Sequence, residues 1–392
     1  MIDMIKTLQS IFRERTAPSL PACTALVLSG GGARAAYQAG VLQFISDRIT
    51  LDPLGVITGV SAGSINAAQL ANHVGNTRDA VAHLVGCWSQ LTPEDVYEPE
   101  SSFSVMMSMM KRSSDHDQEL LPRTGLVDTT PLQGYLRKVM GAEDGRLSGI
   151  ATNIEKGALK ACALVGTEYA TGRSVTWIEG DPLTRWERPR RISKQVHLKV
   201  DHIMASSSLP FLFPAIKVGD AWYGDGGIRQ VEPLSPAVHL GATKILAVST
   251  RYGSNSTESA DPVVVGYPPA AQIFGVLLNA VFLDRLDQDA AGMVRINELI
   301  RHIPPSSRQD LRPIDLLVIR PSRDLGKLSG DFQHDLSGVL KLIGRGLGSK
   351  DTKSPDWLSM ILFEPAYTTG LIDVGYQDAR NQYEELARFF DA

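Results

Sequence analysis

The sequence predicts an α/β fold with a mainly parallel central sheet. Residues 24–32, TALVLSGGG, form a short apolar run that ends in three glycines, and residues 33–49 continue with apolar side chains at helical spacing. Residues 54–74, LGVITGVSAGSINAAQLANHV, repeat the order of apolar run, tight turn and small-residue helix. Two strand–turn–helix units so close together favour parallel strands joined by crossover helices.

Later segments extend this pattern. Residues 159–180 indicate two strands joined around ATGR, and residues 197–228 indicate a helix start, a Ser/Pro-rich turn and short strands. Residues 243–250, TKILAVST, read as one more buried strand. From residue 251 the chain becomes a Ser/Gly/Asn-rich linker followed by helices, with a further strand at 315–322.

The change at residue 251 predicts three parts. We expect an N-terminal helical segment at 1–21, a core at 22–252 that carries the strand–turn–helix units, and a mostly helical C-terminal extension at 253–392 packed on that core. Apolar residues of the first segment fall on one face of a short helix. That helix either docks on the body or binds a membrane surface or a partner.

Composition excludes several classes of protein. The chain has 392 residues and a net charge of −4, so its charge gives no argument for a nucleic-acid partner. Its three cysteines are widely spaced, which makes a zinc site or a disulfide framework a poor fit and suits a reducing, cytoplasmic location. The N-terminus lacks the continuous apolar stretch of a secretory signal peptide.

One uncharged run, residues 263–283, is long enough on paper to span a bilayer. Pro268 and Pro269 interrupt it and leave about fourteen residues of helix, roughly 21 Å at 1.5 Å per residue. That length is too short for a bilayer core. We therefore predict a buried or interfacial helix over the second part of this run.

The GVSAG stretch centred on Ser61 is the first candidate for chemistry. A serine nucleophile needs an exposed oxygen, a base, and donors for the oxyanion that forms. A sharp strand-to-helix turn exposes the oxygen, and glycines two residues to either side, here Gly59 and Gly63, relieve its crowding. The alternatives at this point are a structural turn and a phosphate-binding loop.

Three consecutive glycines, Gly30, Gly31 and Gly32, could present backbone N–H groups to an anion. The pattern fits a nucleotide phosphate loop poorly, because Ala35 stands where the dinucleotide motif needs glycine and no Gly-Lys-Ser/Thr follows. The competing interpretation is an oxyanion hole beside Ser61. Arg34 would then add positive charge nearby or hold the loop through a hydrogen bond.

The base for Ser61 is the third element. None of the eight histidines lies in a small-residue loop at a strand end, where a catalytic group would be presented. Asp225, in YGDGG, follows a short strand and precedes two glycines that allow close approach to another loop. Burial would raise its pKa and make it a better base. Taken alone, it also fits an Asp-Gly turn.

The combination of motifs resembles the patatin-like phospholipases. SGGGARAAYQAGVL, GVSAGSINA, ASSSLPFLFPA and YGDGGI occur in the order found in that family. The resemblance is dense over residues 24–250 and weak near 360–379. It implies a three-layer α/β/α sandwich with a mainly parallel sheet, and a catalytic core at 22–252.

The resemblance also implies roles for individual residues. By motif, Ser61 is expected to be the nucleophile, Asp225 the base, and Gly30–Gly32 with Arg34 the oxyanion loop. The family often has glycine where this chain has Ala35, a change that removes no N–H group. Ser206, Ser207 and Ser208 are expected to be scaffold.

The implied function is a lipid acyl hydrolase of the phospholipase A or lysophospholipase type that needs no cofactor and no metal. A phospholipid or another acyl ester is the implied substrate. A general carboxylesterase and a catalytically silent membrane-docking protein remain as alternatives. Peripheral membrane contact and homo-oligomerisation stay open, as do the acyl chain and the headgroup.

Two segments are expected to help shape the acyl-chain site. The Met-rich residues 103–110 form either a packing helix and loop or a lid that contacts the acyl chain. In the C-terminal extension, the helix at 270–283 is the best candidate to line the site.

Overall fold

A computed structural model of the chain describes residues 23–49, 54–99, 125–180, 186–253, 270–308, 311–330 and 356–391. The predicted N-terminal helix at 1–21 and the Met-rich residues 103–110 lie outside the described residues. The strands are β1 (Thr24–Leu28), β2 (Val56–Val60), β3 (Glu98–Pro99), β4 (Val127–Asp128), β5 (Ala161–Glu168), β6 (Arg173–Gly180), β7 (Glu187–Arg188), β8 (Arg191–Gln195), β9 (Ile216–Val218), β10 (Ala221–Asp225), β11 (Lys244–Val248) and β12 (Asp315–Ile319).

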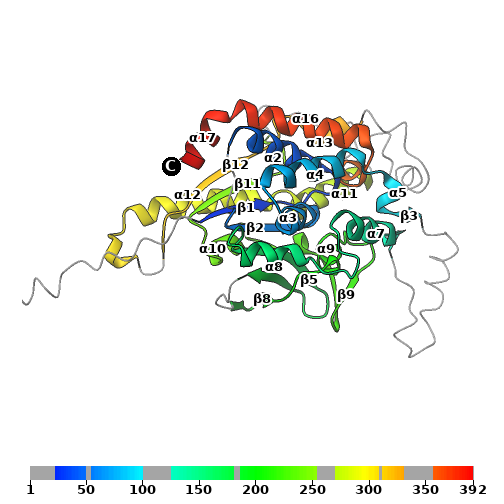
Figure 1. Ribbon diagram of the computed structural model, residues 1–392, viewed down its shortest axis with the longest axis horizontal. Coiled ribbons are helices and arrows are strands. Elements are labelled where there is room, and N and C mark those ends of the chain that lie inside the picture. Colours follow the sequence, from blue (N-terminus) through cyan, green and yellow to red (C-terminus); the bar gives the residue numbers. More distant parts are fainter. Residues whose placement is uncertain are drawn as a thin grey trace, which may run out of the picture.

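Helices alternate with these strands along most of the chain (Figure 1). The α-helices are α2 (Ala36–Arg48), α3 (Ala62–Asn72), α4 (Thr77–Gln90), α5 (Pro93–Val96), α7 (Thr130–Val139), α8 (Ser148–Glu155), α9 (Val200–Ser206), α10 (Ser235–His239), α11 (Ala270–Phe282), α12 (Arg285–Arg301), α13 (Leu325–Gly330), α15 (Asp356–Ile361), α16 (Pro365–Asn381) and α17 (Tyr383–Asp391). Three 3-10 helices are also described: η1 (Gly32–Ala35), η3 (Gly226–Ile228) and η5 (Pro305–Ser307).

Most of the described strands form one mixed sheet in the order β12-β11-β1-β2-β5-β6-β8-β7. The five strands from β12 to β5 are parallel to one another, whereas β6 runs antiparallel to β5. Strand β10 also pairs with β5, in antiparallel orientation, and carries β9. The predicted fold class, an α/β sandwich with a mainly parallel sheet, is therefore confirmed.

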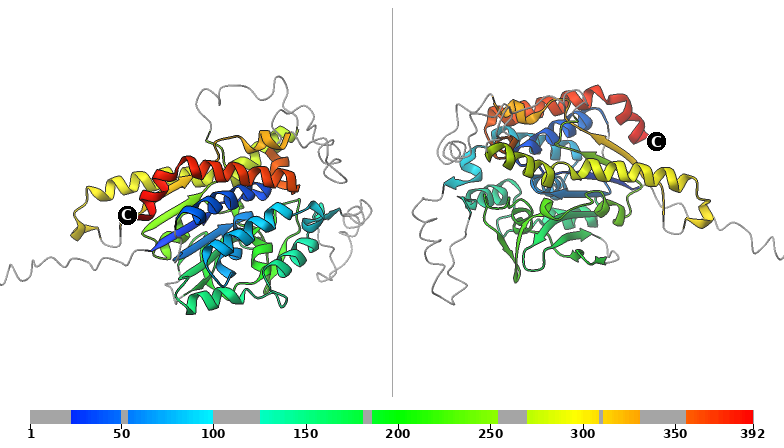
Figure 2. Two further views of the ribbon diagram at one scale, coloured as in Figure 1. Left: turned by 45° about the horizontal axis from the view of Figure 1, so that its top comes forward. Right: turned by 180° about the vertical axis from the view of Figure 1, so that it is seen from behind.

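The two faces of the sheet carry separate apolar cores. In β1, Leu26 and Leu28 belong to the larger core, while Ala25 and Val27 belong to the smaller one. This alternation follows from the two-residue period of a strand. Helices α2, α3, α4 and α16 contribute to the larger core, and α10 and α12 to the smaller one, which gives the three layers seen in Figure 2.

The layer over the larger core contains a close contact between two helices. Helix α16 lies along α2 (Figures 1 and 2). A Cβ atom on Gly40 would collide with the carbonyl group of Ile372, and one on Gly375 would collide with that of Tyr37. Glycine at both positions lets the two backbones approach directly.

Residues after 252 extend the sheet and cover it. Strand β12 pairs in parallel with β11, with Lys244 opposite Asp315, and α16 packs on α2. The boundary at residue 252 stays a prediction.

The helix expected within the uncharged run 263–283 is α11. Leu278 and Phe282 are buried, whereas Ile273, Val276 and Leu277 are exposed, so its side chains divide between core and surface. Within the described residues, no helix has both the length and the apolar character required to span a bilayer.

Candidate active site

Ser61 lies at the turn between β2 and α3. Its φ of 55° and ψ of −135° put a non-glycine residue in a strained region of backbone space, at a cost of about 1–3 kcal/mol. A Cβ on Gly63 would overlap the carbonyl oxygens of Leu28 and Ser29, and one on Gly59 would overlap that of Gly63. The glycines flanking Ser61 are therefore required by close packing of this turn against β1 and α3.

The Ser61 hydroxyl donates a hydrogen bond to Asp225 Oδ2 at 2.6 Å. Sheet register brings the two together, because β2 and β10 follow one another along the same edge of β5, whose other edge pairs with β6. Val60 is opposite Val165, and Asp225 is opposite the next residue of β5, Gly166. The structure thus places these two predicted site residues in direct contact.

Asp225 is fully buried and held by several bonds. Its Oδ1 accepts from the backbone N–H of Gly227 at 2.8 Å, and its own N–H donates to the Ser208 carbonyl at 3.0 Å. Burial raises the pKa of Asp225 to about 7, although the hydrogen bonds from Ser61 and Gly227 oppose this shift. Such a carboxyl group exchanges a proton near neutral pH.

The glycine loop packs directly against Ser61. A Cβ on Gly30 would lie 2.8 Å from the Cβ of Ser61. Gly31 and Gly32 have φ values of 141° and 58°, which side chains rarely tolerate. The N–H groups of Gly30 and Gly31 donate to no acceptor in the described part of the chain. Neither N–H group is therefore occupied by another described residue.

Arg34 lies in the short helix that follows the loop and is buried. Its Nε donates to Ser359 Oγ in α15 at 2.6 Å. Two roles were considered for Arg34 from the sequence: to add positive charge near Ser61, or to hold the loop through a hydrogen bond. The bond to Ser359 is a contact of the second type. It ties the glycine loop to a helix more than three hundred residues away in the chain.

Ser206 has a role that sequence reasoning missed. Its hydroxyl accepts a hydrogen bond from the Ser61 N–H at 3.0 Å and donates to the Val165 carbonyl at 2.6 Å. Ser207 and Ser208 instead donate to carbonyls one turn earlier in α9, those of Ile203 and Met204. Ser206 therefore fixes the strained turn, and the run of three serines gave no signal to distinguish it from its neighbours.

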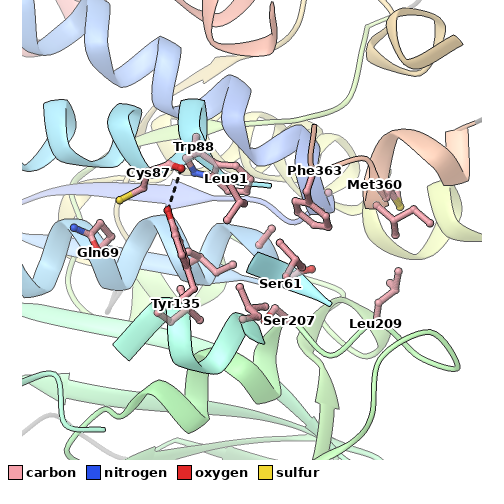
Figure 3. Close-up of a pocket in the computed structure, with 18 of the residues that line it drawn as sticks. Ser61, Gln69, Cys87, Trp88, Leu91, Tyr135, Ser207, Leu209, Met360 and Phe363 are labelled. Atoms are coloured by element: carbon pink, nitrogen blue, oxygen red, sulfur yellow. Dashed lines mark hydrogen bonds between the residues drawn. The ribbon is translucent and has the colours of Figure 1, made fainter. Parts of the chain in front are cut away.

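A cavity of about 820 Å³, open mouth included, reaches Ser61. Figure 3 shows Ser61 between two groups of its lining residues, with Gln69 and Cys87 on one side and Leu209 and Met360 on the other. Most of the lining is apolar. Phe282 of α11 and Met360 of α15 contribute to it, so segments after residue 252 help to form the cavity.

Much of the cavity wall was not anticipated from the sequence. Helix α4 supplies Leu84 and Trp88, and α7 supplies Leu132 and Leu136. The helical spacing of these side chains could have located the buried faces. It could not have told a cavity from an ordinary core.

The described surroundings of Ser61 contain few groups that could bind a metal or act as a base. Among the described residues, no group of three or more His, Cys, Asp or Glu side chains is arranged to hold a metal ion. No histidine is among the described side chains that line the cavity. Asp225 is the titratable side chain in hydrogen-bond contact with the Ser61 hydroxyl.

Comparisons with known proteins agree with the resemblance in the motifs. The model of the patatin-like phospholipase family matches residues 26–238 of this chain. A search of curated protein sequences finds no match.

Similar solved structures include three proteins that are 12–13% identical to this chain and align with 94% of it. They are VipD from Legionella pneumophila, with a TM-score of 0.38, the Pseudomonas aeruginosa type III effector ExoU, with 0.37, and human GIVD cytosolic phospholipase A2 in complex with methyl gamma-linolenyl fluorophosphonate, with 0.40. The alignments cover 68%, 53% and 59% of those chains, so this chain spans little more than half of the last two.

Proposed function

Because the chain belongs to the patatin-like phospholipase family, we propose that it is a serine lipid acyl hydrolase that uses Ser61 and Asp225 to cleave carboxylic esters. The observation that carries this proposal is the 2.6 Å hydrogen bond from Ser61 Oγ to Asp225 Oδ2. A serine hydroxyl bonded to a buried carboxylate is a nucleophile in contact with its base.

The first half of the reaction forms an acyl-enzyme. Ser61 Oγ attacks the ester carbonyl carbon while its proton passes to Asp225. The tetrahedral intermediate then collapses, the bond to the alcohol breaks, and the alcohol leaves with the proton from Asp225. A pKa near 7 suits both transfers, because the same carboxyl must accept and return a proton at neutral pH.

The second half releases the acid. Asp225 accepts a proton from water as the water oxygen attacks the acyl carbon. Collapse of this intermediate breaks the bond to Ser61 Oγ, which regains its proton from Asp225. The products are the free carboxylic acid and the original enzyme.

The glycine loop is the proposed oxyanion site for both halves. The N–H groups of Gly30 and Gly31 lack acceptors in the described part of the chain, and Gly30 packs against Ser61. Removing one such donor costs on the order of 3 kcal/mol of transition-state stabilisation. Arg34 supports the loop through Ser359.

The test is loss of activity and of covalent labelling in matched variants. Ser61→Ala and Asp225→Ala should each abolish ester hydrolysis, and Ser61→Ala should also abolish labelling by a fluorophosphonate probe. Ser207→Ala is the control, since Ser207 lines the same cavity but bonds to Ile203. Retention of full activity in folded Ser61→Ala or Asp225→Ala would refute the dyad. Absence of a Ser61 adduct in the folded parent chain would favour a catalytically silent protein.

Phe211 favours a lipid surface over soluble esters as the source of substrate. Its side chain is 84% exposed at a φ of 67°, and Leu126, whose N–H bonds to the Phe211 carbonyl, is also exposed. Phe213, two residues on, lines the cavity. Hydrolysis should rise sharply when the substrate aggregates, and Phe211→Ser should blunt that rise. Equal rates on monomers and aggregates would favour a general carboxylesterase.

A further inference from the structure

Building on the proposed function, we propose that the part of the cavity between α3, α4 and α7 is an acyl-chain site for medium-length chains, and that Gln69 sets the limit of chain length. This part, which we call the inner limb, runs from Ser61 toward Gln69 and Cys87 (Figure 3). Leu209 and Met360 lie on the other side of Ser61. The acyl chain therefore enters the inner limb, and the alcohol leaves on the other side.

Helix α3 runs beside the inner limb, so the spacing of its residues gives the length of the limb. Ser61, Ile65 and Gln69 are spaced four residues apart, so they share one face of the helix, and all three line the cavity. Eight residues at 1.5 Å each give roughly 12 Å from Ser61 to Gln69, the length of about eight to ten carbons of an extended chain.

The side walls of the inner limb are closed. Leu84, Trp88, Leu132 and Leu136 are each 5% exposed or less. The Tyr135 hydroxyl donates to the carbonyl of Cys87 at 3.1 Å and joins α7 to α4 (Figure 3). An acyl chain can therefore extend only toward the far end.

The far end is a thin partition. Gln69, Val139 and Met140 line the inner limb and also a second cavity, which is open to the surface and whose other walls are Asn72, His73, Val74, His83 and Gly141. Among the described residues, these three alone are common to the two cavities. Space for a longer chain thus exists behind the partition and is blocked by side chains.

Gln69 is the part of this partition that can be removed at little cost. Its Nε2 is hydrogen-bonded to Nδ1 of His83, which is exposed and can bond to water instead. Its Oε1 is buried without a partner in the described part of the chain, a position that polar atoms seldom occupy. Truncation therefore leaves no buried polar group behind, and Gln69 acts here as a wall of the inner limb.

The experiment measures kcat/KM of the full chain on p-nitrophenyl esters from butanoyl to hexadecanoyl. The parent should prefer octanoyl and decanoyl esters and discriminate at least about tenfold against tetradecanoyl, since a filled apolar pocket rejects extra methylenes. Gln69→Ala should move the optimum up by about three to four carbons, because the three residues of α3 that follow Gln69 add roughly 4.5 Å at 1.5 Å each. Ile65→Phe should move it down.

Two controls separate the effect of side-chain size at position 69 from general damage to the protein. Gln69→Leu keeps a wall of similar size and should keep the parental optimum. Gln133→Ala removes the same type of side chain from α7 at a position that bonds to Asp201 outside the cavity, and it should also leave the profile unchanged. A length profile that is flat, or identical in the parent and Gln69→Ala, would overturn the inference.

Binding to the inactive Ser61→Ala chain keeps this inference distinct from the proposed function. By calorimetry, decanoate should bind at least about tenfold more tightly than tetradecanoate, and adding Gln69→Ala should remove that preference. Length-selective binding without hydrolysis by the parent would refute the hydrolase but support the acyl site. Hydrolysis without length selectivity would support the hydrolase but refute the acyl site.

Discussion

Ser61 Oγ donates a hydrogen bond to Asp225 Oδ2 at 2.6 Å across 164 residues of sequence. Strand β5 makes this contact possible, because Val165 and Gly166 pair with the strands that end at the two residues. Ser206 reinforces the arrangement by bonding both to the Ser61 N–H and to the Val165 carbonyl. The contact is therefore a consequence of sheet register.

The pH profile should follow the protonation state of Asp225. Burial raises the pKa of this carboxyl to about 7, and only its charged form accepts the Ser61 proton. We expect kcat/KM to rise with pH through an apparent pKa near 7 and to level off above about pH 8. Initial rates on a non-titrating ester between pH 5 and pH 9 measure this. A rate that is constant down to pH 5 would contradict the role of Asp225 as base.

Asp225 should also make the folded state less stable as pH rises. Its pKa is about 7 when folded against 3.8 as the ordinary value, so the folded state binds more protons between these limits. The free energy of unfolding therefore falls from about pH 4 to pH 7, by about 4 kcal/mol for three pKa units. Asp225→Asn does not titrate and should escape this loss.

Urea unfolding at pH 5 and pH 8 tests the linkage. The free energy of unfolding of Asp225→Asn minus that of the parent should be larger at pH 8 than at pH 5, whether the variant is more or less stable than the parent. A difference that is independent of pH would mean that the folded carboxyl does not have a raised pKa.

The fold class could be predicted because two strand–turn–helix units follow each other closely in the sequence, and the site motifs because glycine marks positions where the backbone is crowded. A Cβ atom on Gly63 or on Gly32 would collide with a backbone carbonyl of another segment. Glycine at these positions therefore indicates a close tertiary contact. The pairing of Ser61 with Asp225 was implied by the resemblance to the patatin-like phospholipases, because Asp225 taken alone also fits an Asp-Gly turn. Their chemical roles, and the boundary at residue 252, remain predictions.

The cavity and the role of Ser206 could not be predicted from the sequence. Leu132 and Leu136 have the spacing of any buried helix face, and periodicity does not report whether that face meets another side chain or an empty space. Ser206, Ser207 and Ser208 are chemically identical, and only the path of the chain around β5 gives the first of them two partners across the fold.

Ser206→Ala should weaken both the fold and the turn that holds Ser61. It removes two buried hydrogen bonds and leaves the Ser61 N–H and the Val165 carbonyl without that partner. We expect a loss of about 1–3 kcal/mol in the free energy of unfolding. We also expect a lower kcat with little change in KM. Ser208→Ala, which loses one bond within α9, is the control and should retain kcat. Equal effects of both variants on kcat would argue against a specific role for Ser206.

Gly30→Ala should reduce catalysis without removing any side chain of the proposed dyad. The new methyl group would lie 2.8 Å from the Cβ and 3.4 Å from the Oγ of Ser61, so the loop or the serine must shift. Oxyanion donors act only when aligned with the developing charge, and we expect kcat to fall by about 10²–10³. Gly134→Ala on α7 is the matched control, because nothing lies within 4 Å of its added Cβ and alanine favours a helix. That control should keep full activity and should unfold at the same or a higher denaturant concentration. If folded Gly30→Ala turned over like the parent, the glycine loop would not be the oxyanion site.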